Sequence, residues 1–139
     1  MTRMDASTSR TALARWHAVV ESRDAAGLPA LVAEDAVFRS PIVHKPYHGR
    51  EAIRALLGGV IRVFEDFRYE RAIGAPDSPD HALVFRARIG ERELEGCDFL
   101  HENADGLIDE FVVMVRPLTA AHALAEGMRA HFEGAVPAP

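Results

Sequence analysis

Residues 66–116 constrain the fold of this 139-residue chain most strongly, because four extended segments follow one another there. In the second segment apolar and charged side chains alternate with a period of two: Leu83, Phe85, Ala87 and Ile89 against Arg86 and Arg88. Such alternation indicates a strand with one face in the core. Gly90–Glu91 and Asn103–Gly106 are typical of hairpin turns. The sequence therefore predicts an antiparallel meander of four strands.

Helical periodicity occurs before and after this predicted meander. Ser9–Glu21 and Gly49–Phe64 carry apolar residues at helical spacing, and a last helix is expected with Thr119 as its cap. A short helix over residues 24–32 and a strand over Ala36–Ser40 complete the order. Helices grouped before and after one antiparallel sheet favour an α+β fold. We expect the helices to close the concave face of a curved sheet and so to enclose a cone.

The length of the chain fits one domain with a sizeable core. We expect this domain to span residues 9–133, with a flexible N-terminus at residues 1–8 and a disordered tail at residues 134–139. No apolar run approaches the roughly 20 residues needed to cross a bilayer, and Met1–Arg10 lack the apolar region of a signal peptide. The simplest location is therefore the cytoplasm, with no membrane as partner.

Charge and cysteine content exclude two further classes of protein. The formal net charge is −5, whereas phosphate contacts require clustered Lys and Arg, so nucleic acid is not an expected partner. Cys97 is the only cysteine, so neither an intrachain disulfide nor a thiolate metal cluster can form.

Asp98 is the most unusual residue of the predicted meander. In the third strand, period-two alternation places Asp98 on the same face as Leu94, Gly96 and Leu100. A carboxylate on an apolar face is costly unless it is paired, hydrogen-bonded or protonated. Asp98 is therefore either a structural hydrogen-bonding group or the centre of a pocket.

The fourth strand, Leu107–Arg116, is apolar on both faces, with Phe111, Val113 and Val115 on one and Val112 and Met114 on the other. Since the helices can cover only one face of the sheet, the outer face needs a second cover. A second copy of the chain is the simplest one, so a homodimer is expected.

This order of elements, together with three short motifs, resembles the nuclear transport factor two-like superfamily. The motifs are Ala33-Glu-Asp-Ala-Val-Phe-Arg-Ser-Pro41, Pro46-Tyr-His-Gly-Arg-Glu-Ala-Ile53 and Asp105-Gly-Leu-Ile108. Within the superfamily the chain is most similar to the SnoaL-like polyketide cyclase and ketosteroid isomerase branch. The resemblance implies an α+β cone, a pocket at its open end and a homodimer.

The resemblance also implies three site positions. An isomerase of this branch has a tyrosine donor on its first helix, a general-base aspartate at the end of its first strand, and a protonated carboxylic acid as second donor. The matching positions here are Trp16, Ser40 before Pro41, and Asp98. A serine has no useful proton affinity near neutral pH, so the standard isomerase route is disfavoured.

We therefore predict a pocket for a small apolar organic ligand, with Asp98 as its evident acid or base. The residues expected to line it are Trp16, Phe38, Ser40, Leu57, Phe64, Phe85, Leu100, Phe111 and Val113. His44 and His48 lie in a loop broken by Pro46, which does not give helical ligand spacing, so no metal is expected. No organic cofactor is expected either. Isomerisation, cyclisation or hydration of an apolar carbonyl or polyketide-like substrate is one reading. A non-catalytic binding or dimerisation module is the alternative.

Overall fold

The computed structural model describes residues 15–23 and 25–135. Their strands form one six-stranded sheet in the order β2-β1-β6-β5-β4-β3. All neighbouring strands are antiparallel except β1 and β6, which are parallel. The strands are β1 Val32–Arg39, β2 Tyr47–His48, β3 Glu65–Ile73, β4 Asp80–Ile89, β5 Arg92–Glu102 and β6 Ile108–Arg116.

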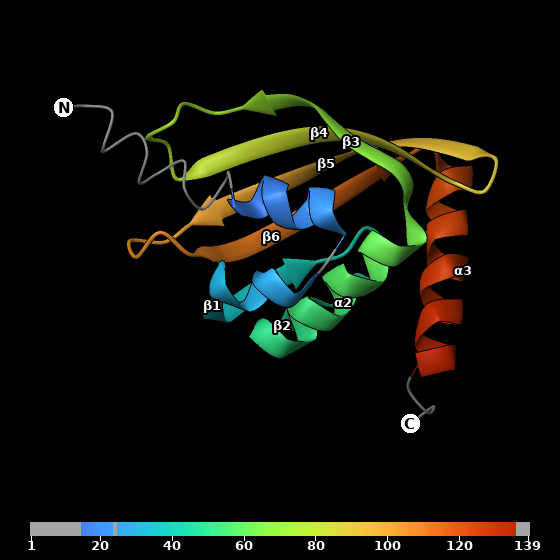
Figure 1. Cartoon of the computed structure of the whole chain (residues 1–139), viewed down its shortest axis with the longest axis horizontal. Helices are drawn as coiled ribbons and strands as arrows, with labels where there is room; N and C mark the ends of the chain where they lie inside the picture. Colours follow the sequence, from blue (N-terminus) through green and yellow to red (C-terminus); the bar gives the residue numbers. More distant parts are fainter. Residues whose placement is uncertain (1–14, 24, 136–139) are drawn as a thin grey trace.

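The helices lie on one side of this curved sheet and at one of its ends (Figure 1). Residues 15–22 are helical, and η1 (Ala25–Ala30) is a 3-10 helix that leads into β1. Helix α2 (Arg50–Val63) crosses the same face, and α3 (Leu118–Ala135) packs beside it. The predicted α+β fold with a curved, mainly antiparallel sheet is confirmed.

The structure corrects the expected helix over residues 24–32. The helical turns end at Ala30 and β1 already begins at Val32, because Val32 pairs with Ile108 of β6 in the parallel part of the sheet. The run Leu31, Val32 and Ala33 is buried on every side, so it lacks the alternation that marks a half-exposed strand.

Three smaller boundaries also differ from the expectation. The loop after Pro41 contains β2, which pairs with β1. Helix α3 starts at Leu118, because the Pro117 carbonyl, rather than Thr119, accepts the first helical hydrogen bonds. This helix continues to Ala135, two residues into the expected tail. Residues 1–14, which include the expected start of the first helix, and residues 136–139 lie outside the described part.

Helices α2 and α3 approach each other closely through two glycines. A Cβ on Gly59 would lie 3.2 Å from the side chains of Met128 and His131, and a Cβ on Gly127 would lie 2.8 Å from Val63. A side chain at position 127 would force Val63 to move, and one at position 59 would press on Met128 and His131. Gly59 is thus explained by close packing. The close approach holds α3 in a position from which Met128 reaches the concave side of the sheet.

The outer sheet face, defined here by Val84, Cys97, Phe99, Val112 and Met114, points away from the helices. Its members alternate along β4, β5 and β6 with the buried residues of the concave face. Phe99 is 40% and Met114 58% exposed. None of the described residues covers these two side chains, so the apolar outer face expected from the sequence is open to solvent in the single chain.

Candidate active site

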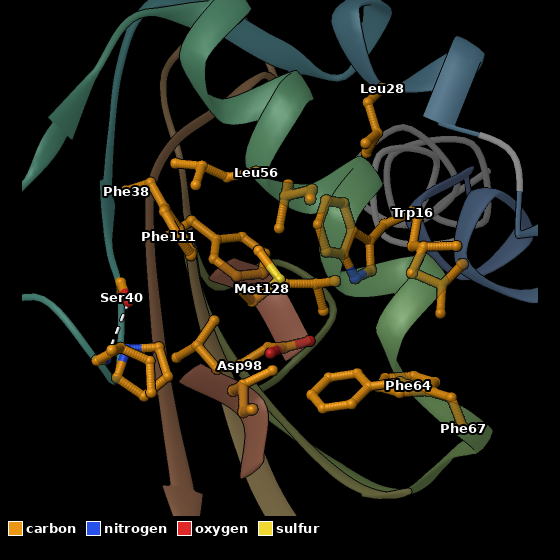
Figure 2. A pocket seen from close by; sticks show the side chains of 18 of the residues that line it. Trp16, Leu28, Phe38, Ser40, Leu56, Phe64, Phe67, Asp98, Phe111 and Met128 are labelled. Carbon is orange, nitrogen blue, oxygen red and sulfur yellow. Dashed lines mark hydrogen bonds between the residues drawn. The ribbon is translucent and has the colours of Figure 1, made fainter. Parts of the chain in front are cut away.

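A cavity lies between the concave face of the sheet and the helices, and its wall is almost entirely apolar. Its walls come from the first helix, β1 and its following loop, α2, β3, β5, β6 and α3. Figure 2 shows the Asp98 carboxyl group pointing into this space, with Ser40 on one side of it and Trp16 on the other. The free space is about 80 Å³. Sites for drug-sized ligands usually measure about 300–1,000 Å³, so this cavity suits a small ligand or one that displaces side chains.

A chain of two hydrogen bonds crosses this cavity wall. The Trp16 indole Nε1–H donates to the Tyr69 hydroxyl at 2.7 Å, and the Tyr69 hydroxyl donates to Asp98 Oδ2 at 2.6 Å. Trp16 comes from the N-terminal helix, Tyr69 from β3 and Asp98 from β5, so the fold brings three distant segments together. The described residues form no hydrogen bond to Asp98 Oδ1, which leaves this oxygen for a ligand.

Burial decides the proton affinity of this group. Asp98 is only 5% exposed. Loss of hydration raises the pKa of Asp98 from 3.8 to about 7, while the hydrogen bond from Tyr69 acts in the opposite direction. Burial also holds the pKa of Tyr69 well above its ordinary value, and the neighbouring Asp98 adds to that rise. Asp98 can therefore gain or lose a proton near neutral pH, whereas Tyr69 keeps its proton.

Counting protons shows what the Tyr69–Asp98 pair can do. With Asp98 ionised, the pair holds one O–H group, which Tyr69 uses to bind Asp98. With Asp98 protonated, the pair holds two O–H groups and needs only one for the bond between them. The second can be donated to an oxygen atom of a ligand. Proton uptake by Asp98 thus converts the pair from an acceptor into a donor.

Ser40 lines the same cavity but is occupied locally. Its Oγ accepts hydrogen bonds from the backbone N–H groups of Ile42 and Val43, at 2.9 and 3.4 Å. This turn holds the loop after β1 against the cavity, and it leaves the Ser40 hydroxyl proton free to donate. Since none of the described residues places a base on its hydroxyl, Ser40 is a wall residue rather than a nucleophile.

The structure places most of the predicted pocket residues on the cavity wall. They are Trp16, Phe38, Ser40, Leu57, Phe64, Asp98, Phe111 and Val113.

The prediction that Phe85 and Leu100 line the pocket is wrong, since both are buried in the core rather than on the cavity wall. The Phe85 ring lies behind Phe64 and Phe67, with ring centroids 5.6 and 4.8 Å away, and these two rings separate it from the cavity. Leu100 packs in the core cluster that contains Leu83 and Phe111, which fills the space around it.

Tyr69 is a site residue that the sequence pattern alone does not single out. The available signal was its position on the inward side of β3, alternating with Phe67, because a buried tyrosine needs a hydrogen-bond partner for its hydroxyl. His17 stacks on the Tyr69 ring with centroids 4.8 Å apart. Within the described residues its Nε2 is buried without a hydrogen-bond partner, and burial lowers the pKa of this imidazole.

The two loop histidines are not drawn into the site. His44 is exposed, and His48 is exposed on β2, where it pairs with Val37. Within the described residues, no group of three His, Cys, Asp or Glu side chains is arranged to hold a metal ion. None of the described helices is both long and apolar enough to cross a membrane.

Comparison with protein families identifies the fold and its relatives. Residues 13–111 match the SnoaL-like domain family. The chain belongs to this family. The comparison with curated protein sequences gave no match.

Solved structures agree with this membership. A steroid delta-isomerase from Pseudomonas aeruginosa shares 44% sequence identity with this SnoaL-like protein, covering 94% of this chain and 96% of that chain with a TM-score of 0.90. A protein from Silicibacter pomeroyi DSS-3 with a cystatin-like fold shares 38% identity, covering 88% and 85% of the two chains with a TM-score of 0.83. The epoxide hydrolase/cyclase-like enzyme SalBIII shares the fold at 16% identity, covering 81% and 92% with a TM-score of 0.65. The predicted resemblance to the isomerase and cyclase branch is confirmed.

Proposed function

We propose that this SnoaL-like protein catalyses proton transfer on a small apolar carbonyl compound without a cofactor, with Asp98 as the group that takes and returns the proton. The observation that carries the proposal is the Trp16–Tyr69–Asp98 hydrogen-bond chain on the wall of an apolar cavity. A catalytic acid or base works best when its pKa is close to the working pH, as the pKa of Asp98 is. The 44% identical relative is a steroid delta-isomerase, which supports a related reaction type.

In the proposed step, ionised Asp98 removes a proton from the carbon next to the ligand carbonyl through Oδ1. The electron pair of the broken C–H bond moves toward the carbonyl oxygen and forms an enolate. Since Asp98 now carries the proton, the Tyr69–Asp98 pair has a second O–H to donate to the enolate oxygen. Return of the proton to another carbon completes an isomerisation. Attack of the enolate carbon on a second carbonyl, whose oxygen then takes the proton from Asp98, completes a cyclisation and restores the ionised base.

This route differs from one with a separate base on β1. Ser40 stands at the position where the family resemblance implies that base, and its hydroxyl cannot hold a proton from carbon near neutral pH. The proposal therefore assigns proton uptake to Asp98 alone. The tyrosine donor is Tyr69 on β3. Trp16 stands at the position on the first helix where the resemblance implies a tyrosine, and its indole N–H orients the Tyr69 hydroxyl.

Exchange of ligand protons with solvent deuterium tests the step without knowledge of the natural substrate. We expect the wild-type protein to accelerate exchange next to the carbonyl of one or more ketones in a panel from cyclohexanone to a steroid β,γ-enone, measured by NMR. The rate should rise with pH and level off above about pH 7, as Asp98 ionises. Asp98→Asn should lose about 100-fold or more of this rate, because no base remains.

Tyr69→Phe is the second arm of this experiment. The variant loses the hydrogen bond that lowers the pKa of Asp98, so the midpoint of the pH–rate profile should move above that of the wild type. Equal rates in wild type and Asp98→Asn would contradict the proposal. Saturable ketone binding without exchange would favour the non-catalytic binding module. If the protein shows no ketone binding and no exchange, both readings are excluded.

We also propose that two copies associate through the outer sheet face. Support comes from the exposure of Phe99 and Met114 on strands whose other face is core, and from the ion pairs of Arg86 and Arg116 with Glu95 beside them. An apolar centre with a charged rim is typical of a specific protein interface.

Disruption of this face should convert the dimer into a monomer. Met114→Glu places a charge at the centre of the interface and is expected to weaken dimerisation at least about tenfold, as measured by analytical ultracentrifugation. Leu118→Glu is the matched control, because Leu118 is 73% exposed at the start of α3 and lies off the sheet. A wild-type protein that stays monomeric at its highest soluble concentration would exclude the dimer.

A further inference from the structure

Arg23 is the one cationic side chain among the described residues that line the cavity. Its side chain is exposed, whereas Asp98 is buried. The cation therefore lies on a solvent-exposed part of the cavity wall, whereas the Asp98 carboxyl group lies on a buried part. Between the two, the wall consists of apolar residues such as Phe64 and Val20.

The backbone and side chain of Arg23 are both fixed at this opening. Arg23 follows the first helix in a left-handed conformation with φ 58°, which is uncommon for a residue with a side chain. Its backbone N–H donates to the Val20 carbonyl at 3.2 Å, and its guanidinium Nη2 donates to the Phe64 carbonyl at 2.9 Å. The hydrogen bond to Phe64 therefore links the end of the first helix to the end of α2.

Within the described residues, most of the hydrogen-bonding capacity of the Arg23 guanidinium has no partner. A guanidinium has five N–H donors, and the structure shows one of them bonded. Arg86 and Arg88 each pair with two carboxylates, whereas no acidic side chain of the described residues lies within ion-pair distance of Arg23. An arginine with free donors suits a planar anion, which it can bind through two parallel hydrogen bonds.

We infer that the ligand of this cavity is an apolar keto acid, whose carboxylate binds Arg23 while its ketone oxygen reaches the Tyr69–Asp98 pair. This inference rests on the proposed function and names the substrate class of the same site. A single arginine matches the single charge of a carboxylate, whereas a phosphate would bring nearly two charges to a protein with net charge −5. The apolar wall then contacts the hydrocarbon part between the two oxygen groups.

The test compares an acid with its neutral analogue. Isothermal titration calorimetry with benzoylpropionate, benzoylbutyrate and their primary amides, which share one aryl ketone, measures the preference for the negative charge. We expect the wild type to bind the better-fitting acid about tenfold or more tightly than its amide, a preference that falls with added salt. Arg23→Gln should abolish the preference and leave amide affinity unchanged.

Two variants separate this inference from the proposed function and from non-specific charge. Arg54→Gln removes an exposed arginine of α2 that pairs with Glu51, and it should keep the preference for the acid. Asp98→Leu should weaken acid and amide alike, because it removes the group that meets the ketone.

The results have defined consequences for the inference. Equal binding of acid and amide by the wild type would overturn it while leaving proton transfer by Asp98 intact. Equal weakening of both ligands by Arg23→Gln would also overturn it, since Arg23 would then act only by holding α2. Failure of all four ligands to bind would exclude aryl keto acids of this size.

Discussion

Asp98→Asn is expected to stabilise the protein at pH 8 and to lose this advantage progressively toward pH 4. The folded protein holds Asp98 protonated up to about pH 7, whereas the unfolded chain releases this proton near 3.8. Between these values the folded state binds one more proton, so stability falls as pH rises. Asn is always neutral, keeps an oxygen that can accept from Tyr69, and removes this dependence.

The size of the effect follows from the shift in pKa. A rise of the Asp98 pKa from 3.8 to about 7, at about 1.4 kcal/mol for each tenfold change in proton affinity, corresponds to on the order of 4 kcal/mol. A whole domain is typically stable by about 5–15 kcal/mol, so one carboxyl group would remove a large part of the margin above pH 7. A protein that retains such a group gains something other than stability from it, as expected for a functional site.

Urea unfolding of wild type and Asp98→Asn between about pH 4 and pH 8 measures this difference directly. The difference in unfolding free energy should grow with pH through the acid range and become constant above about pH 7. The other titratable groups are the same in both proteins, so their contributions to the unfolding free energy cancel in the comparison. Asp77→Asn, an exposed carboxylate in the turn between β3 and β4, is the matched control. A difference that does not change with pH would show that Asp98 is ionised when buried.

The position of Asp98 on the buried face was predictable because its evidence is local. Alternation along β5 places Leu94, Asp98 and Leu100 on one side, and no distant contact is needed for that inference. The same locality explains the correct prediction of β3 to β6, which are joined by hairpin signals in the sequence. The short helix before β1 was mispredicted because a parallel partner 76 positions later, Ile108, extends that strand.

The partners of Asp98 were not predictable in this way. Tyr69 is 29 residues from Asp98 and Trp16 is 53 residues from Tyr69, and β4 lies between β3 and β5. The sheet is curved (Figure 1). Because side chains on the concave face of a curved sheet converge, the Tyr69 hydroxyl can reach Asp98 across β4. Sheet curvature depends on packing across the whole domain, and no pattern in a single strand reports it.

Gly96→Ala is expected to destabilise the protein by about 3 kcal/mol, although alanine is normally more favourable than glycine inside a strand. A Cβ at position 96 would collide with the Phe85 ring, lying 2.7 Å from Cε2 and closer still to Cζ, and it would lie 2.8 Å from the Met114 carbonyl oxygen. Gly96 and Phe85 are register partners on neighbouring strands, and the Phe85 ring occupies the space where a side chain at position 96 would lie. The backbone of β6 cannot move away without breaking its pairing with β5.

Phe85→Leu provides a rescue for this variant, because leucine lacks the distal ring atoms that meet the new methyl group. Phe85→Leu alone should destabilise the wild type, since Phe85 is fully buried, yet it should cost clearly less in the Gly96→Ala background. Urea unfolding of the four proteins gives this coupling as a double-mutant cycle. Additive effects within about 0.5 kcal/mol would show that the ring and the glycine do not depend on each other.

The same substitution connects the core to the cavity. Phe85 stacks on Phe67, and both it and Phe67 contact Phe64, so a displaced Phe85 ring pushes these two wall residues toward the cavity. With only about 80 Å³ of free space, even a small shift of Phe64 or Phe67 would exclude a ligand beside Asp98. Ligand affinity should therefore fall in Gly96→Ala even at temperatures where the variant is folded, and it should recover when Phe85→Leu is added. Gly96 then keeps the cavity open, because the absence of its side chain lets Phe85 lie behind the wall instead of in it.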